Sequence, residues 1–254
     1  MPRPHCQVLR LGLLPYPQAC ELQNSLAVQI AAGECPPALL LLEHPHTYTF
    51  GRRGGADHLI WGQAELERRG IQVCCSDRGG DITYHGPGQL VGYPLIQLST
   101  AGLHTDQNSS RLPQADYLGY VRRLEDVLIR ALQRIGVTAQ RVSGLTGVWV
   151  PAPSHSPSTK ILPAGLAKIA SLGVKVDVHG VTRHGFALNV HPDMAYWQGI
   201  IPCGLPGVSV TSLAELLPEP PSLETVTGFV VQAFGEIFDF QMSELSRTKH
   251  IPPG

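Results

Sequence analysis

The sequence predicts an α+β fold, and three observations lead to that class. At 254 residues the chain suits one large domain or at most two small ones, with enough length to bury a sizeable core. Its 27 glycines and 22 prolines indicate a turn-rich fold rather than a helical bundle. The expected strands and helices follow one another without a regular βαβ alternation, which favours α+β over α/β.

The first half of the chain mixes one clear helix with short apolar runs. Leu22, Leu26 and Ile30 recur at a spacing of four, and Gly33 can end that helix. Short apolar runs bounded by turn residues are typical of buried strands. We expect helices over 17–32 and 63–69 and strands over 38–42, 71–76 and 90–98.

The second half has the most regular helical pattern, with apolar residues at spacings of three and four between Leu118 and Ile135. Ser212 and Glu215 form a capping box that opens a short helix. We expect long helices over 116–135 and 222–240, strands over 137–142, 146–150, 165–178 and 184–190, loops over 101–113 and 151–163, and a polar tail after Ser243.

Composition argues against several classes of protein. Charged residues make up 15% of the chain and the net charge is −1, so duplex nucleic acid is not an expected partner. No apolar run reaches the roughly 18 residues of a membrane span, and a foldable pattern begins near Val8 without a secretory signal. Six cysteines without a CxxC motif predict free thiols in a reducing compartment.

The glycine-rich stretch from Arg78 to Gln89 is the first candidate site. Glycines let a backbone approach a ligand and expose its N–H groups. The spacing is neither that of a P-loop nor that of a GxGxxG dinucleotide loop. A β-hairpin with a tight turn at 86–88 is the alternative, but Arg, Tyr, His and Gln in the same turn favour a binding loop.

Lys168 and Cys203 are the next candidates. Lys168 is the only charged residue between 161 and 174, so it is either a desolvated base in a site or an outward-facing lysine. The residues alone favour the outward lysine, because lysines are mostly exposed. Cys203 lies between Pro202 and Gly204, on a turn where a thiolate can react, unless it is a small inert thiol. The other five cysteines fit the inert, buried interpretation better.

The spacing of the histidines gives little support for a metal site. His44 and His46 form the tightest pair, but no third and fourth ligands follow at a recognisable spacing. We therefore expect a loop there and no metal site. A GxSxG hydrolase elbow is absent as well, and no paired carboxylates suggest glycoside chemistry.

Taken together, the motifs resemble the lipoyl(octanoyl) transferase family. The segment 78–94, RGGDITYHGPGQLVGYP, is similar to that family's signature. The resemblance runs from about Val8 to Phe240. Further matching motifs follow the family's order at 43–45, 146–150, 168–173, 184–189 and 202–205.

The resemblance implies a mixed-sheet fold shared with the catalytic domains of biotin protein ligases and lipoate–protein ligases. It implies one catalytic domain over 1–245 with a C-terminal tail over 246–254. Cys203 matches the acyl-accepting cysteine, Lys168 its dyad lysine, and other matching segments line the acyl pocket. Those pocket residues are Arg78, Gly79, Gly80, Asp81, Ile82, Thr83, Tyr84, His85, Ser171, Leu172, Gly173, Gly185, Phe186 and Ala187.

The activity that the resemblance implies is the first step of endogenous protein lipoylation. An octanoyl group moves from the phosphopantetheine thioester of acyl carrier protein, through a Cys203 thioester, to a lysine of a lipoyl domain. The acceptors would be 2-oxoacid dehydrogenase complexes and the glycine-cleavage H protein. No cofactor, nucleic acid or membrane is expected to take part. The expected compartment is the cytoplasm, or the mitochondrial matrix in a eukaryote.

Two alternatives stay open at this point. An ATP-dependent lipoate–protein ligase shares the implied fold but needs no nucleophilic cysteine. A non-catalytic protein that sequesters acyl carrier protein or fatty acid would bind without turnover. The segments 101–113 and 151–163 look enlarged for the family, which leaves acceptor preference open. The arginine pairs 52–53, 68–69 and 122–123 are candidate contacts for an acidic carrier protein.

Overall fold

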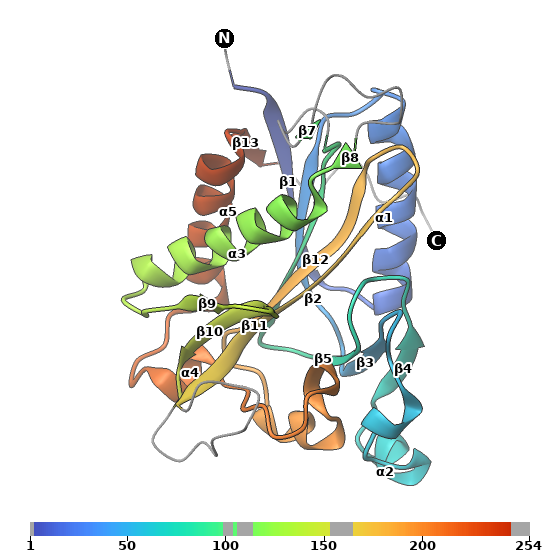
Figure 1. Ribbon diagram of the computed structural model, residues 1–254, viewed down its shortest axis with the longest axis vertical. Helices are drawn as coiled ribbons and strands as arrows, with labels where there is room; N and C mark the ends of the chain where they lie inside the picture. Colours follow the sequence, from blue (N-terminus) through green and yellow to red (C-terminus); the bar gives the residue numbers. More distant parts are fainter. Residues whose placement is uncertain (1–2, 99–103, 106–113, 153–164, 245–254) are drawn as a thin grey trace.

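The computed structural model describes residues 3–98, 104–105, 114–152 and 165–244. Its centre is a mixed eight-stranded sheet in the order β13-β1-β2-β6-β12-β11-β10-β9 (Figure 1). Strand β1 runs parallel to both β13 and β2, and the other neighbouring strands are antiparallel. These strands are β1 (His5–Leu13), β2 (Ala38–Glu43), β6 (Gln89–Leu95), β9 (Gln140–Val142), β10 (Leu145–Pro151), β11 (Leu166–Val176), β12 (Thr182–Asn189) and β13 (Gln241–Glu244).

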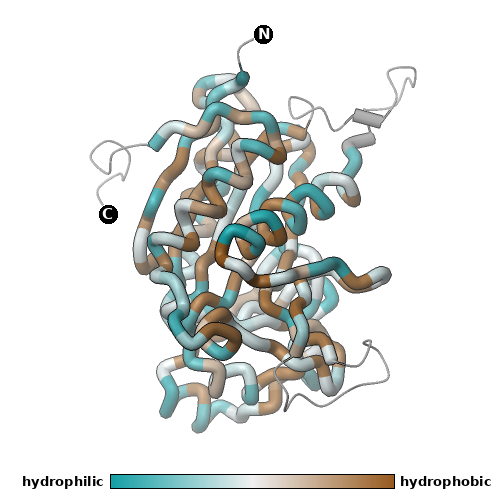
Figure 2. The backbone as a smooth tube through the Cα atoms, turned by 90° about the vertical axis from the view of Figure 1, so that its left-hand side faces the viewer, coloured by the Kyte–Doolittle hydropathy of each residue, from teal (hydrophilic) through white to brown (hydrophobic). Residues whose placement is uncertain are grey.

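Helices cover both faces of this sheet (Figure 1). Leu39 and Leu41 pack with α3 and α5 in one core, whereas Leu40 and Leu42 pack with α1 in another. Successive side chains of a strand point to opposite faces, so the continuous apolar run in β2 is buried on both sides. In Figure 2, hydrophilic and hydrophobic segments alternate along the helices, as expected where one helix face packs on a sheet. The helices are α1 (Tyr16–Ala31), α2 (Gln63–Arg68), α3 (Tyr117–Arg134), α4 (Leu213–Leu216) and α5 (Leu223–Phe238).

A smaller sheet of order β4-β3-β5 packs beside the large one and contributes one wall of the site. The chain leaves β5 at His85 and enters β6 at Gln89, but the two strands belong to different sheets. The hairpin alternative for the glycine-rich stretch is therefore wrong. The remaining elements are β3 (Thr47–Phe50), β4 (Gln72–Cys75), β5 (Ile82–His85), β7 (His104–Thr105), β8 (Gln114–Ala115) and the short 3₁₀ helices η1 (Ala56–His58), η2 (Met194–Gly199) and η3 (Pro202–Gly204).

The predicted α+β class is confirmed, and so are the helices expected over 17–32, 116–135 and 222–240, with small shifts at their ends. The segment after the last helix forms a strand that the sequence did not predict, because β13 covers Gln241–Glu244 and reaches one residue into the tail expected after Ser243. His5 lies opposite Gln241 in that pairing, a sequence separation that no local pattern reveals.

Several expectations fall on residues outside the described ranges. The loop predicted over 101–113 is described only at 104–105, and the one over 151–163 only at 151–152. The tail over 246–254 also lies outside, so the domain boundary at 245 stays a prediction. Within the described part of the chain, no helix combines the length and apolar character needed to cross a membrane.

Candidate active site

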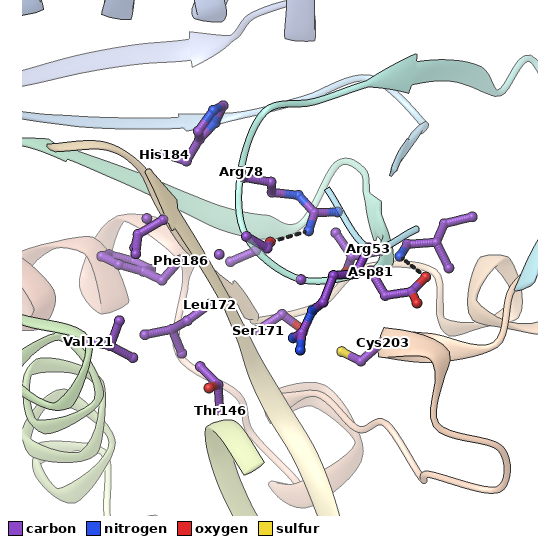
Figure 3. A pocket seen from close by; sticks show the side chains of 18 of the residues that line it. Arg53, Arg78, Asp81, Val121, Thr146, Ser171, Leu172, His184, Phe186 and Cys203 are labelled. Atoms are coloured by element: carbon purple, nitrogen blue, oxygen red, sulfur yellow. Dashed lines mark hydrogen bonds between the residues drawn. The ribbon is translucent and has the colours of Figure 1, made fainter. Parts of the chain in front are cut away.

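A pocket of about 540 Å³ lies where the glycine-rich loop meets β11, β12 and η3 (Figure 3). Val121, Leu172 and Phe186 lie on one side of it, and the Cys203 sulfur points into it from the other. Arg78 and Asp81 come from the loop between them. The pocket therefore joins an apolar wall to a thiol and to charged groups.

Lys168 lies near the start of β11 and points into this pocket. Its side chain is only 4% exposed, and its Nζ lies 3.0 Å from Cys203 Sγ. Its backbone N–H donates to Ser209 O at 2.8 Å, and its carbonyl accepts from Thr211 N–H at 3.0 Å. Lys168 is thus held between β10 and the segment around Val210. The outward-facing lysine that the residues alone favoured is wrong, because these long-range pairings decide its direction.

Gly147 in β10 gives the lysine its path to the thiol. Its φ is +134°, and a Cβ atom at this position would overlap Lys168 Cε. The β10–β11 register also shifts beside Lys168, between Val148 and Trp149. Lys168 Nζ lies 5.3 Å from the centre of the Trp149 ring, which is within cation–π distance. A bare backbone on one side and an aromatic ring on another therefore confine the amine.

Cys203 is the middle residue of η3 and has a left-handed backbone, with φ 59° and ψ 16°. For a residue other than glycine this conformation costs roughly 1–2 kcal/mol. The turn is fixed against η1, since Ile201 N–H donates to His58 O at 2.8 Å. A Cβ atom on Gly204 would lie 2.5 Å from Asp81 Oδ2. The half-buried thiol is thus presented by a strained turn, a feature often found where function requires it.

The side chain of Arg78 is buried beneath the glycine-rich loop. Its guanidinium donates to Thr49 O at 2.6 Å, to Thr49 Oγ1 at 2.9 Å and to Gly79 O at 3.0 Å. Within the described part of the chain no ion pair joins it to a carboxylate, and burial lowers the pKa of Arg78. Gly79 N–H donates to Val174 O at 3.0 Å, which ties the loop to β11. The loop thus brings to the pocket wall a positive charge that no direct ion pair neutralises.

Buried histidines and tyrosines form the wall behind this loop. His44 Nε2 lies 2.8 Å from Tyr93 Oη, and His85 Nδ1 lies 2.8 Å from Gln89 Oε1. Burial lowers the pKa of His44 to about 4 and that of His85 well below its usual value, so both rings are neutral at pH 7. These rings shape the pocket without adding charge.

His184 lies at the upper end of the same wall in Figure 3, and its ring is paired with Asp77. His184 Nε2 lies 2.6 Å from Asp77 Oδ1, and burial lowers the pKa of His184 despite that partner. Although burial disfavours the Asp77 carboxylate, hydrogen bonds from Lys175 and His184 lower the pKa of Asp77. At pH 7 the pair therefore consists of a neutral His184 imidazole hydrogen-bonded to a charged Asp77 carboxylate.

The structure brings all the predicted site residues except Tyr84 to the pocket. Side chains alternate along β5, so Thr83 and His85 face the pocket while Tyr84 faces the core of the small sheet. Tyr84 Oη lies 2.9 Å from His46 Nδ1 there, which corrects its predicted place in the acyl pocket. The wall also contains residues that the sequence did not single out as ligand contacts: Tyr16, Arg53, Tyr93, Val121, Gly144, Leu145, Thr146, Val174, His184 and Leu205.

For some of these missed residues the sequence contained a pattern that could have pointed to them, and for others it contained none. Thr146 and His184 lie inside motifs that carried the family resemblance, and Arg53 was considered only for carrier docking. Tyr16 and Val121 come from helices far away in the sequence, where nothing local marks them as pocket residues. Of the other cysteines, Cys6 is buried as expected, whereas Cys75 is exposed, which corrects its predicted burial. The described residues contain no group of three His, Cys, Asp or Glu side chains placed to hold a metal ion.

Comparison with known proteins identifies the class to which this fold and pocket belong. The family model described as the lipoyl protein ligase A/B catalytic domain matches residues 15–235, and the chain belongs to that family. Within it, the chain is similar to octanoyltransferases. The octanoyltransferase of Chloroflexus aggregans is 42% identical over 234 residues, which cover 92% of this chain and 95% of that relative.

Solved structures confirm the predicted fold. A structure of a bi-partite lipoate protein ligase and its E2 lipoyl domain from Thermoplasma acidophilum matches with a TM-score of 0.64 at 16% identity, covering 97% of this chain and 89% of that chain. A biotin protein ligase from Aquifex aeolicus matches with a TM-score of only 0.46 at 12% identity, covering 92% of this chain and 69% of that chain, so a fold shared with biotin protein ligases stays a prediction. The α+β fold is thus shared with lipoate protein ligases.

Proposed function

We propose that this protein is an octanoyltransferase in which Cys203 carries the octanoyl group as a thioester. The similarity to octanoyltransferases along nearly the whole chain supports the reaction. The observation that carries the mechanism is the 3.0 Å separation between Lys168 Nζ and Cys203 Sγ in a pocket with an apolar wall. An ATP-dependent ligase activates its acid as an adenylate and needs no nucleophilic cysteine beside the lysine.

In the first half-reaction the Cys203 thiolate attacks the thioester carbonyl of the octanoylated carrier protein. The Lys168 ammonium stabilises the thiolate before attack. The new bond joins Cys203 Sγ to the octanoyl carbon, and the bond to the pantetheine sulfur breaks. Lys168 then gives its proton to the departing sulfur and is left as a neutral amine. Exchange between two thiols leaves the thioester energy nearly unchanged.

In the second half-reaction the amino group of an acceptor lysine attacks the Cys203 thioester. Neutral Lys168 takes the proton that this amine loses as the amide forms. Cys203 departs as a thiolate beside the regenerated ammonium, so the pair returns to its starting state. Conversion of a thioester to an amide is downhill, and the reaction therefore needs neither ATP nor a cofactor beyond the phosphopantetheine of the donor.

The apolar wall accounts for the acyl group. Val121, Leu172 and Phe186 face the pocket opposite the thiol (Figure 3). Each methylene buried there contributes about 0.8 kcal/mol, which favours an eight-carbon chain over short ones. The acceptors in this proposal are the lipoyl domains of 2-oxoacid dehydrogenase complexes and the glycine-cleavage H protein. They would meet the enzyme in the cytoplasm, or in the mitochondrial matrix in a eukaryote.

Intact-protein mass spectrometry tests this proposal directly. The protein is mixed with octanoyl-acyl carrier protein without ATP or acceptor, and an octanoyl adduct that hydroxylamine removes is expected. Cys203→Ser should lack the adduct while keeping a wild-type circular dichroism spectrum. Cys75→Ser is the matched control, because that thiol is exposed and lies outside the pocket wall. Octanoylation of a lipoyl domain only when free octanoate and ATP are supplied would instead establish a ligase.

A further inference from the structure

Glu125 is a fully buried carboxylate on α3 that the mechanism above does not use. Its Oε1 accepts a hydrogen bond from Gly147 N–H at 3.0 Å. Its Oε2 lies 2.7 Å from Arg122 Nη1 and 3.3 Å from Arg141 Nε. Removing a carboxylate from water is costly, and partners must compensate for that cost. Here the two arginines balance the charge, while the other oxygen is committed to a single backbone N–H group.

That N–H group belongs to the residue on which Lys168 packs. An added Cβ on Gly147 would lie 3.2 Å from Lys168 Nζ, which shows how closely the lysine passes this backbone. With φ at +134°, Gly147 has a backbone conformation that other residues rarely adopt. The N–H group is buried, so no solvent replaces the carboxylate if Glu125 is lost.

We propose that Glu125 is a positioning residue for Lys168, acting through Gly147. The carboxylate holds the Gly147 peptide in its unusual conformation, the peptide leaves room for the lysine side chain, and the ammonium is thereby aimed at Cys203 Sγ. This inference rests on the proposed role of the Lys168–Cys203 pair. A lysine side chain is flexible, so without a fixed surface its amine would sample positions away from the thiol.

The competing explanation is that Glu125 only ties α3 to β9 through Arg141, while Arg122 on α3 itself completes the ion pairing. The two explanations need different parts of the carboxylate, since positioning needs an oxygen acceptor at Gly147 and anchoring needs negative charge. Glu125→Gln keeps an acceptor for Gly147 and loses the charge. The arginines are about a third exposed and can turn to water, so the amide oxygen should stay with Gly147. Glu125→Asp keeps the charge near the arginines but is one methylene too short to reach Gly147.

The test measures alkylation of Cys203 by iodoacetamide, followed by peptide mass spectrometry, together with the rate of octanoyl-enzyme formation. Glu125→Asp should slow both by about tenfold or more, and Glu125→Gln by less than about threefold. Thermal unfolding shows whether each variant is folded, and Glu125→Met replaces Glu125→Asp if that variant is not. Asp126→Asn is the matched control, because Asp126 is the next residue of α3 and pairs with Arg141, whereas the Gly147 N–H donates to Glu125. It should react at the wild-type rate.

A double-mutant cycle completes the test. If Glu125 acts through Lys168, Glu125→Asp should slow neither rate further in a Lys168→Ala background. Equal slowing in both backgrounds, or a Glu125→Gln variant slower than Glu125→Asp, would overturn the proposal in favour of anchoring. Failure of the underlying mechanism looks different, because Lys168→Ala would then itself react at the wild-type rate.

Discussion

The two groups of the proposed dyad lie 3.0 Å apart but are held in opposite ways. Lys168 extends from a strand and is fixed by backbone hydrogen bonds to Ser209 and Thr211. Cys203 belongs to a three-residue turn with a left-handed backbone and rests on a neighbouring loop. A proton-transfer group benefits from a fixed position, whereas the sulfur must accommodate an acyl group and release it. The contrast predicts that the strand side of the site, which holds the base, tolerates less structural change than the turn that presents the nucleophile.

Among the substitutions that test this contrast, replacing Lys168 should have the largest effect on the rate of acyl transfer. We expect Lys168→Ala and the similarly sized Lys168→Met to slow octanoyl-enzyme formation by about a hundredfold or more, because they remove the ammonium that activates the thiol. The fold should survive, since both replacements also remove a buried charge. Single-turnover kinetics with octanoyl-acyl carrier protein measures the rate, and thermal unfolding measures the stability.

If both lysine variants acylate at the wild-type rate, Lys168 merely fills space beside the thiol. If only Lys168→Ala is slow, packing of the side chain rather than its charge supports the reaction. Either outcome would end the interpretation of this strand as the carrier of a rigid base.

Alanine substitutions at two glycines, one in the strand and one in the turn, allow the tolerance of the two sides to be compared through the free energy of unfolding. An alanine at Gly147 would meet Lys168 and the Ala170 carbonyl within a sheet, so we expect a loss of about 3 kcal/mol in unfolding free energy. An alanine at Gly204 would meet the ends of the Asp81 and His58 side chains, which are hydrogen-bonded to each other, rather than a backbone carbonyl, so a smaller loss of about 2 kcal/mol is expected. Chemical denaturation measures both values.

Gly136→Ala is the control for this pair of variants. Its φ is +84°, and nothing lies within 4 Å of an added Cβ, so it reports the backbone cost alone. Gly204→Ala should exceed this control by about 1 kcal/mol, because two side chains must shift, and Gly147→Ala should exceed it by more. The reverse order would mean that the turn, not the strand, is the rigid side of the site.

Low pH should reduce the stability of the fold through the buried histidines behind the glycine-rich loop. His44 is buried as a neutral ring with a pKa lowered to about 4, whereas the same side chain in the unfolded chain takes up a proton near pH 6.5. Stability from this group is therefore complete above pH 6.5 and is lost as the pH falls towards 4. Between pH 7 and pH 5 we expect His44 to remove about 2 kcal/mol of stability.

Denaturation at several pH values measures this slope, and His44→Gln should reduce it. His85 contributes in the same direction, because burial lowers its pKa as well. His179→Gln is the control at an exposed position and should leave the slope unchanged. A stability that does not change between pH 7 and pH 5 would show that these rings reach a partner or solvent on protonation.

The same contrast explains which parts of the site the sequence predicted. Cys203 was placed correctly on a turn because Pro202 and Gly204 flank it, which is a local signal. The direction of Lys168 depends on Gly147 and on the segment around Val210, both distant in sequence, so general preferences gave the wrong orientation. Only the family resemblance placed it correctly. The sequence did not predict strand β13 for the same reason, since its partner β1 lies at the other end of the chain.

The smallest expected effect concerns the mouth of the pocket on the nucleophile's side. Arg53 is exposed and lines the pocket, its backbone N–H donates to Gly80 O at 3.0 Å, and within the described ranges its side chain forms no ion pair. A phosphopantetheine donor is anionic, so Arg53→Glu should raise KM for the carrier protein by about three- to tenfold and leave kcat nearly unchanged. Arg52 is equally exposed but does not line the pocket, which makes Arg52→Glu the matched comparison.

The dependence of KM on ionic strength distinguishes a direct contact between Arg53 and the donor from long-range electrostatic attraction. If Arg53 touches the donor, Arg53→Glu should remain worse than Arg52→Glu at high ionic strength, because a contact inside a pocket is screened less than a surface field. If both variants weaken binding equally and lose their effect in salt, the pair only steers the carrier towards the site. A KM unchanged in both variants would assign carrier docking to another surface and leave the loop at 51–54 as support for the glycine-rich loop, to which its backbone is bonded.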